Sequence, residues 1–361
     1  MGPASKRKIY LSMTKSRCKM ARNRIFDFLD ELAKKSGISE LIINSSESIF
    51  VEKDGEMIRI DVKFTEGEVD HFAKEIAQYN KKDFDEKNPI LDGNLPDGSR
   101  INIIHKNFTK TTHAITIRKF HKNIQKFDSS PGIFGLSDKW VKFLKAVVKS
   151  RMNIVVSGGT GAGKTTLLNL FLQEISPKER IISIEDTREL QFHHVNSVRL
   201  ESRQTDGTYL SIRDLLKNTL RMRPDRIIVS EVRGAEVFDL LQAMNTGHEG
   251  SMTTIHSNSA PEALSRLENL FLLAGYDLPM RALRFQISEA IDFIIQIKRD
   301  REGKRYISQV TEVSNLEGDR ILIQDVGVFK NDELKFNGLV PGRFEELQKH
   351  GGLPQDFFSN T

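Results

Sequence analysis

The chain has 361 residues, a length that accommodates two or three domains. Hydrophobic residues make up 38% of it and charged residues 29%, which fits a folded globular protein and excludes a disordered one. No apolar run approaches the roughly 18–20 residues of a membrane-spanning helix, and the basic N-terminus lacks the apolar core of a secretory signal. The single cysteine, Cys18, excludes an intramolecular disulfide and a cysteine-based structural zinc site, so we expect a cytoplasmic protein.

The excess of positive charge is concentrated at the start of the chain. The formal net charge is +5, yet residues 1–24 contain eight basic and no acidic side chains. Residues 25–361 carry 46 basic and 49 acidic side chains, a net charge of −3. A nucleic-acid-binding body should be basic across one face, so this distribution argues against that class. We expect residues 1–24 to form a basic arm, either a disordered tail or a segment that associates with an anionic membrane or an acidic protein surface.

The first half of the chain predicts a small mixed α+β domain at residues 25–120. Apolar residues recur there first with helical spacing and then in short alternating runs that are typical of half-buried strands. The expected elements are a helix at 25–35, strands at 41–43, 49–52 and 57–62, a helix at 69–79, and a pair of strands at 100–105 and 113–120.

A linker is expected at residues 121–137, where a Ser-Ser-Pro-Gly cluster interrupts the pattern. Beyond it, residues 138–345 alternate apolar strand-like runs with helical segments, which predicts an α/β domain built on a mostly parallel sheet. Residues 346–361 are expected to be a tail that frays after a short helix. The expected elements are a helix at 138–150, strands at 153–157, 180–185, 197–200, 226–230, 251–255 and 292–297, and two further strands at 306–313 and 320–329.

The segment Gly158–Thr165 matches the phosphate-binding pattern G-x-x-x-x-G-K-[ST]. It follows a buried strand-like run and precedes a helical one, so backbone N–H groups and a helix N-terminus are expected to face a phosphate. Lys164 is expected to reach the β- and γ-phosphates, and the Thr165 hydroxyl to ligate Mg²⁺. The expected nucleotide-binding residues are Gly158, Gly159, Thr160, Gly161, Ala162, Gly163, Lys164, Thr165 and Thr166.

Carboxylates follow two of the expected strands at their C-terminal ends, where ligands of open α/β sheets bind. Glu231 is expected to hold Mg²⁺, with a solvated strand-end charge as the alternative. Glu185 is favoured as the residue that polarises the attacking water, and Asp186 is its competitor. Only one of the two should face the nucleotide, because adjacent strand residues point to opposite faces. His256 ends a third strand, and we expect it to sense the γ-phosphate rather than serve only as a structural hydrogen-bonding group.

Seven arginines near these strands are candidates for stabilising the negative charge of a transferring phosphate. They are Arg188, Arg199, Arg203, Arg213, Arg221, Arg223 and Arg226.

Several segments together resemble the type II/type IV secretion ATPase superfamily. They are GGTGAGKTT, IEDTREL and LRMRPDRIIVSEVRGAEVFDLLQAMNTGHEGSMTTIHSNS. The sequence around MRPDRII and TTIH is most similar to the CpaF/TadA branch, which powers Tad (tight adherence) pili. The resemblance covers about residues 36–330.

The resemblance implies a RecA-like P-loop NTPase domain preceded by a small PAS-like domain, hexameric rings, and ATP bound between the two domains. It assigns Gly158–Thr165 as Walker A, Glu185 as the catalytic glutamate, Glu231 as Walker B and His256 to the His box. It further suggests that Arg100 and Arg118 reach the nucleotide phosphates, and that two arginine-finger candidates lie at the subunit boundary, namely Arg213 and Arg221. Ser230 and Ser257 depart from the Gly and Ala that are usual in the family.

The expected function is therefore a hexameric, Mg²⁺-dependent ATPase motor at the cytoplasmic face of the inner membrane. It would drive assembly of a Tad/type IV-like pilus, with retraction as a further option, or secretion of protein subunits, together with platform proteins of the inner membrane. The alternative is a P-loop nucleic-acid translocase, which the near-neutral body disfavours. A regulatory nucleotide-binding scaffold with little turnover is a third possibility.

Overall fold

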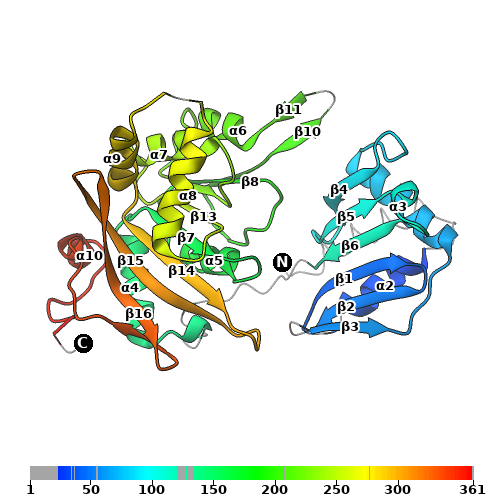
Figure 1. Ribbon diagram of the computed structural model, residues 1–361, viewed down its shortest axis with the longest axis horizontal. Coiled ribbons are helices and arrows are strands. Elements are labelled where there is room, and N and C mark those ends of the chain that lie inside the picture. The colour runs from blue at the N-terminus through cyan, green and yellow to red at the C-terminus, as the bar shows by residue number, and fades with distance from the viewer. Residues whose placement is uncertain are drawn as a thin grey trace, which may run out of the picture. The chain divides into compact units, whose positions relative to one another are not determined.

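The computed structural model describes residues 23–33, 35, 37–53, 56–119, 127, 133–205, 208–275 and 277–359. Its contacts divide the chain into two compact units, Met1–His121 and Lys122–Thr361. The N-terminal unit has one hydrophobic core and the C-terminal unit has two. Figure 1 labels the elements of both units. The basic arm expected at residues 1–24 lies outside the described residues except for its last two, and so does most of the expected linker.

The N-terminal unit is a six-stranded antiparallel sheet in the order β3-β2-β1-β6-β5-β4, with helices α2 and α3 packed on one of its faces. Alternate strand residues such as Leu41, Ile101 and Ile117 point into this core and are fully or almost fully buried. Its elements are α2 (Arg24–Ala33), β1 (Ile38–Ser45), β2 (Ser48–Lys53), β3 (Glu56–Ile60), α3 (Glu66–Asn80), β4 (Ile90–Asn94), β5 (Arg100–Ile104), the 3₁₀ helix η1 (Lys106–Phe108) and β6 (Ala114–Arg118).

The C-terminal unit is built on a nine-stranded sheet in the order β17-β16-β15-β14-β7-β13-β12-β8-β9. The six strands from β14 to β9 are parallel, and β15, β16 and β17 extend the sheet in antiparallel fashion. The strands are β7 (Ile154–Gly158), β8 (Ile181–Glu185), β9 (Ser197–Glu201), β12 (Arg226–Val229), β13 (Met252–Ile255), β14 (Phe293–Arg299), β15 (Arg305–Glu317), β16 (Arg320–Lys330) and β17 (Glu333–Phe336).

Helices cover both faces of this sheet, as the alternation of strands and helices in the sequence predicts. Ile154 and Val156 of β7 point into one core with helices α4, α5 and α10, whereas Val155 between them points into a second core with α6 to α9. The remaining elements are η2 (Ile133–Gly135), α4 (Asp138–Lys149), α5 (Lys164–Gln173), α6 (Ile212–Thr219), α7 (Glu236–Asn245), α8 (Ala260–Leu272), α9 (Met280–Ala290), α10 (Phe344–Lys349) and the small hairpin β10 (Arg203–Thr205) and β11 (Thr208–Leu210). Among the described helices, none is both long enough and apolar enough to cross a membrane.

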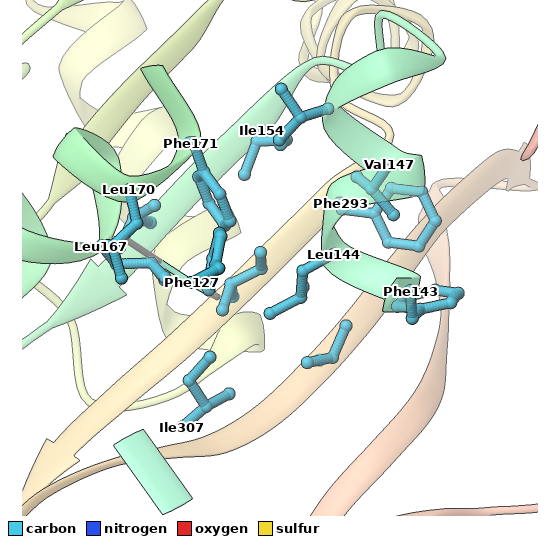
Figure 2. Packing of buried hydrophobic residues seen from close by; sticks show 14 of the residues in the cluster. Phe127, Phe143, Leu144, Val147, Ile154, Leu167, Leu170, Phe171, Phe293 and Ile307 are labelled. Atoms are coloured by element: carbon cyan, nitrogen blue, oxygen red, sulfur yellow. The ribbon is translucent and has the colours of Figure 1, made fainter. Parts of the chain in front are cut away.

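The helix behind the phosphate-binding segment is anchored deep in the first core. Leu167, Leu170 and Phe171 of α5 are at most 1% exposed and lie in the packed cluster that Figure 2 shows. Phe171 meets the ring of Phe127 at a centroid distance of 6.0 Å. Because close-packed interiors resist deformation, this packing fixes the N-terminus of α5, and the expected linker contributes to it through Phe127.

The end of the chain is part of the same core, which corrects the expectation of a fraying tail at residues 346–361. Beyond α10, Phe357 and Phe358 are buried against Phe143 and Phe336. The carboxylate of Glu312 also accepts hydrogen bonds from the backbone N–H groups of residues 342 and 343, both at 2.9 Å. Local sequence pattern misses this packing because it depends on distant residues such as Phe143, more than 200 residues earlier in the chain.

Candidate nucleotide-binding site

The phosphate-binding segment lies between the end of β7 and the start of α5, as the sequence predicts. Gly163 is the N-cap of α5 and has a φ of 103°, a left-handed conformation that favours glycine. A Cβ on Gly158 would come within 2.7 Å of the carbonyl oxygen of Ile297 on the neighbouring strand β14. Both glycines are therefore required by the backbone path of the loop.

The N-terminus of α5 has the features of an anion site. Gly163 supplies no side chain to cap it, so its first backbone N–H groups have no side-chain partner from the N-cap residue. These N–H groups and the helix dipole favour a negatively charged group. Phosphate oxygens fit this set of donors.

Lys164 begins α5, and its ammonium folds back over the loop. Its Nζ donates to the carbonyl oxygens of Gly158 and Gly159 at 2.9 and 3.0 Å. The same Nζ lies 3.4 Å from Nδ1 of His256, and the residue is only 8% exposed. The ammonium is therefore held at the mouth of the loop, close to the end of β13.

His256 and Glu231 meet beside this lysine. Nε2 of His256 lies 2.9 Å from Oε1 of Glu231, a close approach without the alignment of a hydrogen bond. Burial lowers the pKa of His256, and the neighbouring ammonium of Lys164 lowers it further. The neutral ring is thus the favoured state near pH 7, and three residues from separate parts of the sequence converge at one edge of the sheet.

Arg233 extends this group of charges. Its guanidinium lies 2.8 Å from Oε2 of Glu231 and 3.8 Å from a carboxylate oxygen of Asp186. The bond to Glu231 raises the pKa of the already basic Arg233 side chain. Asp186 is exposed and also accepts a hydrogen bond from the hydroxyl of Ser202, at 2.9 Å. Sequence reasoning did not single out Arg233, although it stands two residues after Glu231.

Glu185, the favoured water-polarising residue, is fully buried at the end of β8. Its Oε2 accepts two backbone N–H bonds of 2.7 Å, from Glu189 and Leu190, and its Oε1 lies 3.4 Å from Arg199. Burial raises the pKa of the Glu185 carboxyl, while these hydrogen bonds oppose that shift. The carboxylate therefore holds the loop that follows β8, and its neighbour Asp186 points to solvent.

Glu189, on that same loop, contacts the phosphate-binding segment directly. Its Oε2 lies 3.2 Å from Oγ1 of Thr165, the hydroxyl expected to ligate Mg²⁺. Hard cations such as Mg²⁺ take hydroxyl and carboxylate oxygens, so Thr165 and Glu189 together offer two ligands of the preferred kind. The available signal was a second glutamate four residues after Glu185 in the same motif, IEDTREL.

Arg305 approaches the phosphate-binding segment from the hairpin between β14 and β15. Its Nε donates to the carbonyl oxygen of Gly161 at 3.2 Å. A Cβ on Gly163 would lie 3.1 Å from Cδ of Arg305 and 3.0 Å from the ring of Phe134. No sequence motif marks Arg305, because its partner is 144 residues away.

The predicted arginines fall into different environments. Arg226 is fully buried and binds Glu179 at 2.7 Å, so it stabilises the fold at the amino end of β12. Arg213 pairs with Asp239 at 2.6 Å. Arg221 is exposed and makes no ion pair with any described residue.

Arg100 and Arg118 belong to the N-terminal unit, where β5 and β6 place them directly opposite one another. Their strand neighbours Ile101 and Ile117 point into the core, so both arginines lie on the other, open face of the sheet. Glu40 of β1 is the partner of Arg118 on its other side. Burial raises the pKa of Glu40, and so does the nearby carboxylate of Glu52.

These features define a P-loop NTPase fold: a glycine-rich loop before a helix, with acidic and histidine side chains at the ends of neighbouring parallel strands. The family model described as "Type II/IV secretion system protein" matches residues 26–338, and the chain belongs to this family.

Individual relatives agree with this assignment. The chain is 36% identical over 287 residues to the conjugal transfer protein TrbB of Rhizobium radiobacter, covering 78% of this chain and 85% of the relative. It is 31% identical over 319 residues to the type IV secretion system protein VirB11 of Bartonella henselae, covering 77% and 88%. The X-ray structure of the ATPase DotB of Legionella pneumophila shares the fold, with a TM-score of 0.57, 20% identity, and coverage of 84% and 83%.

Proposed function

We propose that this chain hydrolyses ATP and that the convergence of Lys164, His256 and Glu231 is the core of its active site. The observation that carries the proposal is the ammonium of Lys164, held within 3.0 Å of two loop carbonyls and 3.4 Å of His256. The N–H groups at the start of α5 would receive the phosphates. Negative charge that develops during phosphoryl transfer would be stabilised by Lys164 and by backbone amides that are already in place.

Thr165, Glu231 and Glu189 are the residues that would hold Mg²⁺, which supplies charge neutralisation to the phosphates. We assign Glu189 to orienting the attacking water, because it is the carboxylate that touches Thr165. Glu185, which the sequence favours for that role, then acts as a positioning residue that holds the Glu189 loop through two backbone N–H bonds. His256 would report the state of the γ-phosphate to Glu231.

Arg100 and Arg118 would reach the nucleotide from the N-terminal unit, of the same or a neighbouring chain. Their opposed positions on one sheet face would let both side chains contact the same polyanion. Arg221 is the better arginine-finger candidate of the two, because Arg213 already has an ion-pair partner within the chain.

At the level of the assembly, we propose a hexameric motor at the cytoplasmic face of the inner membrane that drives pilus assembly or protein secretion with membrane platform proteins. VirB11 is named as a type IV secretion system protein, and DotB as an ATPase. Within that class we favour the Tad pilus branch on the segments MRPDRII and TTIH. Light scattering with and without a non-hydrolysable ATP analogue tests the ring, and a monomer under all conditions would exclude it.

A nucleic-acid translocase is the second candidate, and one observation favours it: TrbB is named as a conjugal transfer protein. The net charge of −3 over residues 25–361 opposes it. ATP turnover that single-stranded or duplex DNA stimulates, with a steep decline at rising salt, would establish the translocase and exclude the protein motor.

A further inference from the structure

A concavity lies at the opposite edge of the C-terminal sheet from the phosphate-binding segment. It has a volume of about 560 Å³, which is within the usual range for ligand sites. Residues 152 and 153 precede β7, and Asp292 precedes β14, so the cavity opens at the amino ends of the parallel strands. Nucleotides bind at the carboxyl ends of such strands, so this cavity needs another occupant.

The charges around the cavity are unbalanced. Arg343 is matched by Asp292 at 2.8 Å, and Arg151 lies between Glu179 and Asp225 at 3.1 and 3.6 Å. Three more carboxylates line the cavity and make no ion pair with any described residue, namely Glu249, Glu289 and Glu346. The unpaired charge is therefore negative.

The pKa of Asp292 is consistent with an excess of negative charge around the cavity. Burial raises the pKa of that carboxyl, and the carboxylates of Glu346 and Glu312 raise it further, against the opposing effect of Arg343. The cavity also offers apolar surface. Phe285 is 54% exposed at its wall, an unusually large fraction for a phenylalanine, and Met244 lies beside it, almost fully buried.

The chain itself contains a segment of the complementary kind. Residues 6–15 read Lys-Arg-Lys-Ile-Tyr-Leu-Ser-Met-Thr-Lys, three apolar residues in a row between basic ones. They lie outside the residues that the structure describes. Residues 1–24 hold eight basic side chains and no acidic one, whereas residues 25–361 have a net charge of −3.

We propose that residues 6–15, from the same chain or from a neighbouring copy, dock in the acidic cavity between α9 and α10. The basic side chains would face Glu249, Glu289 and Glu346, and residues 9–11 would cover Phe285. Charge complementarity and an apolar anchor together would hold the arm at a specific binding site on the protein rather than on a lipid surface. This inference is independent of the proposed ATPase activity.

The test uses the full chain with a photoreactive benzophenone attached to its single cysteine, Cys18, three residues beyond Lys15. After irradiation, mass spectrometry locates the attachment points. We expect them in the walls of the cavity, at residues 244–249, 285–292 and 343–350. The Glu249→Lys/Glu289→Lys double variant should lower that yield about fivefold or more, and high salt should lower it in the unaltered chain.

The matched control is Glu302→Lys/Glu345→Lys, which reverses two exposed glutamates that do not line the cavity and should leave the yield unchanged. The unfolding midpoint should be the same in both double variants and in the unaltered chain, which shows that each is folded. Attachment at scattered sites, or a yield that charge reversal in the cavity does not alter, would overturn the proposal. Attachment only to lipid, in the presence of phosphatidylglycerol vesicles, would overturn it in favour of membrane docking.

Discussion

Arg100 and Arg118 face each other directly across strands β5 and β6. Like charges at opposed positions of a sheet repel and lower stability, so such a pair needs a compensating partner. Glu40 lies opposite Arg118 on the third strand and compensates part of this charge. In the proposed function, an ATP phosphate would bind on the sheet face that carries both arginines.

Replacing Arg118 by alanine should weaken ATP binding without destabilising the fold. A charge-assisted hydrogen bond contributes about 1.5–3 kcal/mol, so the KM for ATP should rise about 10- to 150-fold. The free energy of unfolding without nucleotide should change by less than about 0.5 kcal/mol, since the variant removes a repulsion. Arg59→Ala, on the edge strand β3, is the control; equal KM values for the two variants would contradict the assignment.

Separate substitutions of Glu185 and Glu189 should distinguish a structural role from a catalytic one. Glu189→Gln should lower ATP turnover about 100-fold or more at nearly unchanged stability, because it removes the carboxylate beside Thr165. Glu185→Gln should lower the free energy of unfolding by about 1–3 kcal/mol, since an amide cannot reproduce a buried carboxylate that faces Arg199. Urea unfolding and steady-state kinetics measure both. The reverse pattern would make Glu185 the water-polarising residue.

The buried histidine of the N-terminal unit should make stability depend on pH. His113 is 2% exposed, its Nδ1 accepts the N–H of Lys106 at 2.9 Å, and its Nε2 lies 3.1 Å from Asp70. Burial lowers its pKa, so below the ordinary value of about 6.5 the unfolded chain binds more protons than the folded one. Stability from this group is present above that value and is lost as pH falls through the lowered pKa.

His113→Gln should flatten this dependence, because glutamine offers both an acceptor and a donor and does not titrate. Unfolding midpoints measured from pH 8 to pH 5 would show a smaller decline for the variant than for the unaltered chain. An equal decline of the unfolding midpoint in the variant and in the unaltered chain would show that protonation of His113 does not lower stability.

Removing a ring at the end of the chain should destabilise the C-terminal unit. Phe357 is 6% exposed and packs on Phe143 and Phe336. Phe357→Ala should lower the free energy of unfolding by about 3–5 kcal/mol, as for other buried phenylalanines. Phe108→Ala is the control, because Phe108 is 66% exposed and should tolerate the change. An equal, small effect of both substitutions would support the expectation that the end of the chain frays.

The convergence of Lys164, Glu231 and His256 could be predicted from the sequence because it follows from the parallel direction of the strands. Carboxyl ends of parallel strands share one edge, so any residue that ends such a strand is placed there. The roles of Glu185 and Glu189 could not be predicted in this way. They depend on the path of one loop, whose backbone N–H groups turn towards Glu185.

Strand β4 shows a second limit of sequence pattern. The expected elements include no strand at these residues, Ile-Leu-Asp-Gly-Asn. In the structure a Cβ on Gly93 would lie 2.6 Å from the side chain of Asn80, whose amide binds the backbone of Asn94 at 2.9 and 3.1 Å. The glycine makes room for a contact 14 residues away.

The central claim, that Lys164 and its loop bind and hydrolyse ATP, is tested most directly by the ATP turnover of Lys164→Ala. Its control is Lys178→Ala, which removes an exposed lysine of the same unit. We predict that Lys164→Ala loses at least about 100-fold of the turnover, since it removes the cation nearest the loop, while Lys178→Ala keeps its activity. Equal turnover in the two variants would contradict the account.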